Sequence, residues 1–136
     1  MIVSFESFYS GVFSLATERR LRRVLELIGA HPSLSVSQLA SEVRVSPAHL
    51  QRLFKQRTGV RISEVIVECR LQKAASLLST SELQIKEVAF AVGYEHHSSF
   101  VRAFQRRFAQ SPRMFRERTD SVSGDSLSMI VKAAAD

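Results

Sequence analysis

The sequence contains few of the residues that mark disulfide scaffolds, turn-rich folds or membrane spans. Of its 136 residues, one is cysteine, three are proline and five are glycine. A single cysteine excludes a disulfide framework, and a reducing, cytoplasmic setting is expected. No apolar run approaches the roughly 18 residues that a membrane-spanning helix needs, so a membrane is not an expected partner. No basic stretch precedes the apolar residues at the N-terminus, so no secretory signal is expected.

Positive charge, in contrast, is abundant and clustered. The chain has 19 Lys and Arg against 13 Asp and Glu, a net charge of +6. Residues 44–61 hold five basic residues and no acid, and residues 102–118 hold six basic residues and only Glu117 as an acid. Such a field attracts polyanions such as nucleic acid or an acidic membrane. A solvated basic surface that serves solubility is the alternative.

Apolar residues recur with the 3.6-residue period of an α-helix, which predicts an all-α fold. The length fits one domain or two very small ones. We expect an apolar N-terminal segment at 1–16, which helical spacing makes a candidate helix, and a flexible C-terminal tail at 119–136. The expected helices lie at 17–30, 36–43, 46–58, 62–78, 85–92 and 97–108, followed by a last turn through 115. Thr17 is the expected N-cap of the first of them.

An internal repeat organises this pattern. Residues 36–59 resemble residues 85–109: Ala40 corresponds to Ala89, an offset of 49, and Arg52 corresponds to Arg102, an offset of 50. One extra residue therefore lies in the second turn. Each copy is a short helix, a tight turn and a longer helix, which is a helix-turn-helix. We expect subdomains at 17–60 and 80–118, joined by a linker helix at 61–79.

The longer helix of each copy has an apolar face and a polar face that suits DNA. A major groove admits one helix, where Arg pairs with guanine, Gln pairs with adenine and a small apolar side chain touches a thymine methyl. Cations and helix N-termini neutralise phosphates. The predicted base contacts are Ala48, Gln51, Arg52, His97, Ser98, Val101 and Arg102. The predicted phosphate contacts are Ser46, Lys55, Arg57, Gln105, Arg106 and Arg107.

The linker adds a geometric expectation. A 17-residue helix is about 25 Å long. With its flanking turns it could hold two recognition helices about 34 Å apart, one turn of DNA. One chain would then enter successive major grooves of one duplex, on an asymmetric site.

From residue 34 to residue 118, the chain resembles the C-terminal DNA-binding domain of the AraC/XylS family of bacterial transcription regulators. The matching residues are Ser46-Pro47 with Leu50, Arg52, Leu53, Phe54, Lys55 and Thr58-Gly59; Arg70-Leu71 with Ala74, Leu77 and Leu78; Ile85 with Val88, Ala89, Val92, Gly93 and Tyr94; and Ser99-Phe100, Arg102, Phe104, Phe108, Ser111-Pro112 and Arg116.

This resemblance implies seven helices in two subdomains, promoter binding in the bacterial nucleoid, and activation through contact with RNA polymerase. Three residues depart from the family pattern. Arg44 stands at the first turn and Ala109 follows the second recognition helix, where the family usually has Gly in both places. Phe115 replaces a usual Tyr.

Several alternatives stay open. The chain is either a stand-alone regulator or a fragment of a longer one, and residues 1–16 offer either a homodimer contact or packing against the domain. The rival function is a protein-interaction module that no longer binds DNA, which Arg44 in the turn favours. Neither a cofactor nor a metal is expected, because the histidines have no ligand spacing. No catalytic set can be assembled, so an enzyme is not expected.

Overall fold

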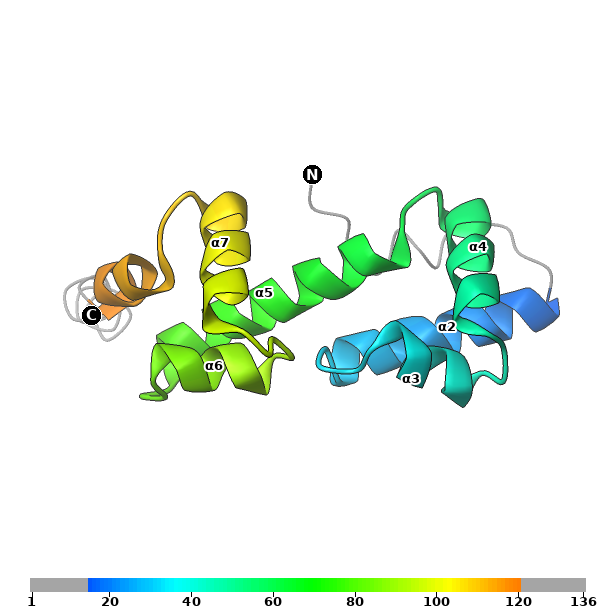
Figure 1. Ribbon diagram of the computed structural model, residues 1–136, viewed down its shortest axis with the longest axis horizontal. Helices are drawn as coiled ribbons and strands as arrows, with labels where there is room; N and C mark the ends of the chain where they lie inside the picture. The colour runs from blue at the N-terminus through cyan, green and yellow to red at the C-terminus, as the bar shows by residue number, and fades with distance from the viewer. Residues whose placement is uncertain (1–14, 121–136) are drawn as a thin grey trace, which may run out of the picture. The chain divides into compact units, whose positions relative to one another are not determined.

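A computed structural model describes residues 15–120 of the chain, and all of its regular structure over that range is helical (Figure 1). The helices are α2 (Leu15–Ala30), α3 (Val36–Glu42), α4 (Pro47–Thr58), α5 (Ile62–Thr80), α6 (Ile85–Ala91) and α7 (His97–Phe108), followed by a helix over 112–120. The all-α prediction with two helix-turn-helix units is thereby confirmed. Residues 1–14 of the apolar N-terminal segment lie outside the described residues, and so do residues 121–136 of the predicted tail.

Two predicted helix ends were wrong. We expected Thr17 to cap α2, but the helix begins at Leu15, so Thr17 lies inside its first turn. The expected last turn is a full helix that continues through residue 120, into the predicted tail. Its start is fixed by Ser111, whose Oγ accepts a hydrogen bond from the Met114 backbone N at 3.2 Å. Within the part of this helix beyond residue 115, Thr119 Oγ1 donates a hydrogen bond to the Phe115 carbonyl oxygen at 2.7 Å.

The chain divides into two compact units, and the boundary lies between Arg70 and Leu71, within α5. The core of the first unit draws on α2, α3, α4 and the first half of α5, with Val24, Leu39, Leu50 and Phe54 fully buried. α3 packs against both α2 and α4. The burial of these apolar faces supplies the main stabilisation of the unit, at roughly 25 cal/mol per Å² of apolar surface.

The second unit has a more aromatic core. Phe100 and Phe104 of α7 are fully buried, together with Val88 of α6 and Ala74 of α5. Phe104 lies at the centre of the aromatic cluster, with ring-centroid distances of 5.7 Å to Phe100, 4.6 Å to Phe108 and 5.4 Å to Phe115. The helix at 112–120 is thus held to the unit through Phe115.

The backbone repeats as the sequence predicted. α3 and α6 both have seven residues, and α4 and α7 both have twelve. Both short helices begin with a capping box, formed by Ser35 with Gln38 and by Gln84 with Glu87. These boxes satisfy N–H groups that a helix start leaves unpaired.

Both residues that stand where the family usually has glycine adopt left-handed backbone. Arg44 has φ 59° and Ala109 has φ 60°, and they are the only non-glycine residues with positive φ among residues 15–120. Their repeat partners, Gly93 and Gly59, have φ 107° and 77°. The family's preference for glycine therefore has a backbone cause, since side chains other than glycine are strained in this region.

Two arginines stabilise the fold by hydrogen bonds to loop carbonyl groups. Arg70 donates from Nε to the Pro32 carbonyl oxygen at 2.7 Å, and also to the Leu34 carbonyl oxygen at 3.3 Å. In the second unit, Arg116 donates from Nε to the Leu78 carbonyl oxygen at 3.2 Å and from its other nitrogens to the carbonyl oxygens of Ser81 and Leu83. Each guanidinium thus ties down the loop before the short helix of its unit.

Candidate nucleic-acid interface

α4 presents a polar face opposite its buried one. Leu50 and Phe54 are fully buried. Ala48, Gln51 and Arg52, the predicted base contacts of the first unit, are all exposed. The helix begins at Pro47, where the absent N–H costs no hydrogen bond, and Ser46 Oγ accepts from the His49 backbone N at 3.1 Å. The first unit therefore offers three candidate base-reading side chains on one rigid helix.

The predicted base contacts of α7 are exposed at all positions but one. His97, Ser98 and Arg102 are exposed as predicted. We expected Val101 to face outward, but it is half-buried and packs against the core of the second unit. The side chain of Val101 is apolar, so it packs against the core instead of pointing into solvent. Gln51, the equivalent residue of α4, is polar and stays in solvent.

The predicted phosphate contacts fall into two groups. Arg57, Gln105 and Arg106 are simply exposed. Lys55 is exposed, and its Nζ donates to the Gly59 carbonyl oxygen at 2.9 Å, just past the end of α4.

The remaining two predicted phosphate contacts have structural contacts of their own. Ser46 is exposed, and its hydroxyl caps α4. Arg107 is half-buried, and its guanidinium carbon lies 4.8 Å from the centre of the Phe108 ring, a cation–π contact.

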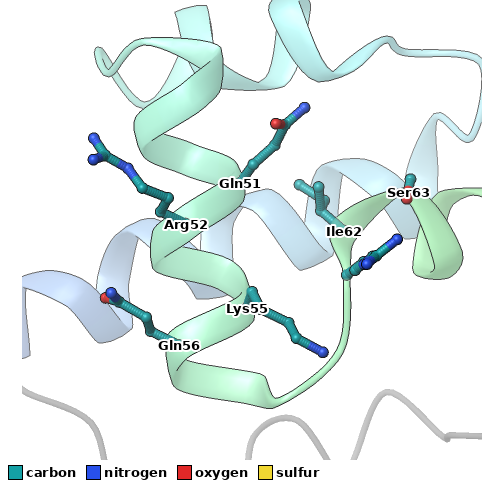
Figure 2. A pocket seen from close by; sticks show the side chains of 7 residues that line it. Gln51, Arg52, Lys55, Gln56, Ile62 and Ser63 are labelled. Atoms are coloured by element: carbon teal, nitrogen blue, oxygen red, sulfur yellow. The ribbon is translucent and has the colours of Figure 1, made fainter.

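An open groove of about 500 Å³ runs between α4 and the start of α5, and all of its lining residues except Ile62 are polar or charged. In Figure 2, Gln51 and Lys55 leave α4 on the side of Ile62 and Ser63, whereas Arg52 and Gln56 leave it on the other side. Gln56, Arg61 and Ser63 line the groove, and sequence reasoning gave none of them a role. Arg61 belongs to the acid-free basic run at 44–61, which was the available signal.

Other reactive groups are isolated. Within residues 15–120, no group of three or more His, Cys, Asp or Glu could hold a metal ion. Over the same range, no helix has the length and apolar character needed to span a bilayer. Cys69 is half-buried, and burial, with a smaller contribution from Glu68, raises the pKa of its thiol to about 11.

Two helix-turn-helix units, each with a cationic and exposed second helix, define a helix-turn-helix protein. Residues 39–118, more than half of the chain, match the model of a helix-turn-helix domain family. The chain belongs to this family, the AraC-type helix-turn-helix domains of transcription regulators. The relatives and structural neighbours described next are transcription regulators or their DNA-binding domains.

Individual relatives support this assignment. The transcriptional regulator GlxA of Rhizobium meliloti is 39% identical over 88 residues, which cover 65% of this chain and 27% of GlxA. This chain thus spans about a quarter of that relative's length. An AraC-type regulator from Chromobacterium violaceum is 29% identical with a TM-score of 0.64, over 78% of this chain and 96% of that one. The DNA-binding domain of AdpA, solved with a target DNA, shares the fold at 24% identity and a TM-score of 0.69, over 78% of this chain and 97% of that one.

Proposed function

We propose that this chain binds double-stranded DNA by sequence and regulates transcription at promoters as an activator. In this proposal α4 and α7 enter successive major grooves of one duplex. The observation that carries it is the equivalence of Arg52 and Arg102. Each is the sixth residue of a twelve-residue second helix, and each is exposed. A bidentate arginine at this place discriminates a guanine by about 1–3 kcal/mol.

The two helices differ in the rest of their reading face, so the proposed site is asymmetric. In the first unit, Gln51 offers a bidentate pair to adenine and Ala48 offers a methyl group to thymine. In the second unit, Ser98 and His97 contribute polar contacts. Val101 adds only the part of its side chain that the core leaves exposed.

Phosphate contacts would fix the position of each helix without choosing the sequence. We assign this role to Lys55 and Arg57 in the first unit, with the Ser46 hydroxyl at the start of α4. Gln105 and Arg106 take it in the second unit. Arg107 joins them from its position over the Phe108 ring.

The RNA polymerase contact and the nucleoid follow from the family resemblance, whereas the homodimer rests on the apolar residues of segment 1–16, for which packing against the domain is the alternative. We propose contact with RNA polymerase at the promoter, a homodimer through residues 1–16, and a place in the bacterial nucleoid within the cytoplasm. No cofactor takes part in this proposal. Residues 1–16 largely fall outside the described range, so truncation of residues 1–14 and measurement of the oligomeric state test the dimer.

The rival function, a protein-interaction module, was favoured by Arg44 in the first turn. The structure counts against that ground, because the hydrogen bond that closes the first turn recurs in the second. The Val45 backbone N donates to the Ala40 carbonyl oxygen at 3.1 Å, and the Tyr94 backbone N donates to the Ala89 carbonyl oxygen at 2.9 Å. Arginine at this position therefore strains the first turn without opening it.

A binding experiment with a salt titration tests the proposal. Duplexes are enriched from a random library by in vitro selection with this chain, and affinity is then measured from 50 to 200 mM salt. With 6–10 phosphate contacts, affinity falls about 10³–10⁵-fold over this range. Failure to enrich any duplex, together with a stable protein complex, would favour the rival.

A further inference from the structure

The cationic groove beside α4 includes residues that the base-reading proposal does not use. We call it the α4–α5 groove, and its lining comprises Gln51, Arg52, Lys55, Gln56, Arg61, Ile62 and Ser63 (Figure 2). Three of these residues are cations and none is an acid. The nearest acid in the sequence, Glu64, does not line the groove. Arg52 leaves α4 on its other side (Figure 2), so Lys55 and Arg61 are the two cations on which the charge of the groove depends.

Within the described part of the chain, this charge is not neutralised by ion pairs. Arg52 and Arg61 are exposed, and neither forms an ion pair there. The Lys55 ammonium group donates to the Gly59 carbonyl oxygen, a neutral acceptor that leaves the charge in place. Arg23 of α2 differs, since its guanidinium lies 3.9 Å from the Glu26 carboxylate. An uncompensated cluster of this kind attracts anions from solution.

Comparison with the second unit marks Arg61 as a feature of the first unit. At the offset of 50, Arg61 corresponds to Ser111 and Ser63 corresponds to Arg113. Arg113 is ion-paired, because its Nε lies 3.3 Å from Glu117 Oε1. Each unit thus has a cation shortly after its recognition helix, at positions that the repeat does not equate. Among the described residues, Arg61 forms no ion pair, whereas Arg113 does.

We propose that Arg61 is a phosphate anchor that acts with Lys55, and that one strand of the DNA backbone runs along the α4–α5 groove. This inference rests on the proposed function, because it requires α4 in the major groove. The hydroxyl of Ser63 and the amide of Gln51 add neutral donors to the same groove, while Ile62 is 2% exposed and forms part of its base. Anchoring at Arg61 would set the position of α4 without choosing a base.

The experiment compares four proteins on two duplexes, one enriched by in vitro selection and one with the same bases shuffled. The proteins are the unchanged chain, Arg61→Gln, Arg61→Lys and Arg23→Gln. Arg23→Gln is the matched control, because it removes the same charge from an exposed site in the same unit but outside the groove. Thermal melting by circular dichroism establishes that all four proteins are equally folded, which the exposure of Arg61 leads us to expect.

One lost phosphate contact lowers the slope of log affinity against log salt by about 0.9. The advantage of the unchanged chain over Arg61→Gln should therefore shrink about 3.5-fold between 50 and 200 mM salt, equally on both duplexes. Arg61→Lys should keep most of the slope, and Arg23→Gln should keep all of it.

Three results would overturn the anchor. They are an unchanged slope in Arg61→Gln, an equal loss in Arg23→Gln, or an effect confined to the selected duplex. Failure of the proposed function is a separate result, in which the unchanged chain itself binds neither duplex. A duplex RNA of the selected sequence serves as a third probe. If it binds as tightly as the DNA and depends equally on Arg61, the groove binds polyanions in general, which would contradict a site for the DNA backbone.

Discussion

Arg70 and Pro32 are 38 residues apart in sequence and are joined by a hydrogen bond of 2.7 Å from Nε to the carbonyl oxygen. The same guanidinium reaches the Leu34 carbonyl oxygen, so one side chain fixes both ends of the short loop between α2 and α3. Arg70 is only half-buried, but its bonds join the middle of α5 to the start of the helix-turn-helix. This contact holds α3 in place, and α4 packs on α3.

We expect Arg70→Met to destabilise the first unit by about 1.5–3 kcal/mol, the usual range for a hydrogen bond that involves a charged group. Methionine retains the length and apolar stem of the side chain, so the change removes mainly the bonds. Arg20→Met, at an exposed position of α2, is the control, with an expected effect within about 0.5 kcal/mol. Urea denaturation followed by circular dichroism measures both. Equal effects of the two substitutions would contradict a special role for Arg70.

The residue that follows each recognition helix has left-handed backbone, and it is Gly59 in the first unit and Ala109 in the second. Each can therefore be replaced by the residue of the other unit. Ala109→Gly should stabilise the second unit by about 0.5–1 kcal/mol, since strain at φ 60° is relieved and only part of the gain is lost to chain entropy. Gly59→Ala should cost about 1 kcal/mol from backbone strain alone, because an added Cβ would meet nothing within 4 Å. Melting temperatures that move in the same direction for both substitutions would contradict this explanation.

Two phenylalanines of the second unit provide a matched pair. Phe104 is fully buried in the aromatic cluster, and Phe104→Ala should cost about 3–5 kcal/mol. Phe90 on α6 is 79% exposed, and Phe90→Ala should change stability by less than about 0.5 kcal/mol. Hydrogen exchange of α7 amides would report both effects. A larger loss of protection for Phe90→Ala than for Phe104→Ala would show that the core is wrongly placed.

Cys69 should react slowly with thiol reagents. Burial raises the pKa of its thiol from 9.0 to about 11, so below pH 9 its thiolate fraction is about a hundredfold lower than that of a free cysteine. Labelling by a disulfide reagent at pH 8 should be slow in the folded chain and fast in urea. Because the folded pKa is the higher one, the associated stability is complete below pH 9.0 and is lost as the pH rises towards 11. Labelling that is equally fast in folded and unfolded protein would contradict the burial of this thiol.

Much of the fold could be predicted from the sequence, because the signals were local. Ser46-Pro47 and Gly59 bound α4 within the sequence itself, and the spacing of Leu50 and Phe54 identifies its buried face. The repeat then predicted α7 from α4. Thr17 was misjudged because a residue suited to capping also tolerates the interior of a helix.

The site was harder to predict, because helical spacing fixes the direction of a side chain only coarsely. Val101 and Gln51 hold the same position in their helices, yet only Val101 leans on the core. Arg107 was counted among the phosphate contacts with no sign of its packing on Phe108. Arg61 lies outside both recognition helices, so neither helical wheel includes it. The groove that gives it a role exists only when α4 and α5 are folded together.

Base preference measured by in vitro selection is the decisive test of whether Arg52 and Arg102 each read a base, with the unchanged chain, Arg52→Ala, Arg102→Ala and Lys55→Ala compared in parallel. We expect each arginine substitution to cost about 1–3 kcal/mol and to relax one base position, a different position for each, whereas Lys55→Ala weakens all sequences alike. Base preferences that stay identical in all four proteins, or no selected sequence at all, would contradict the account.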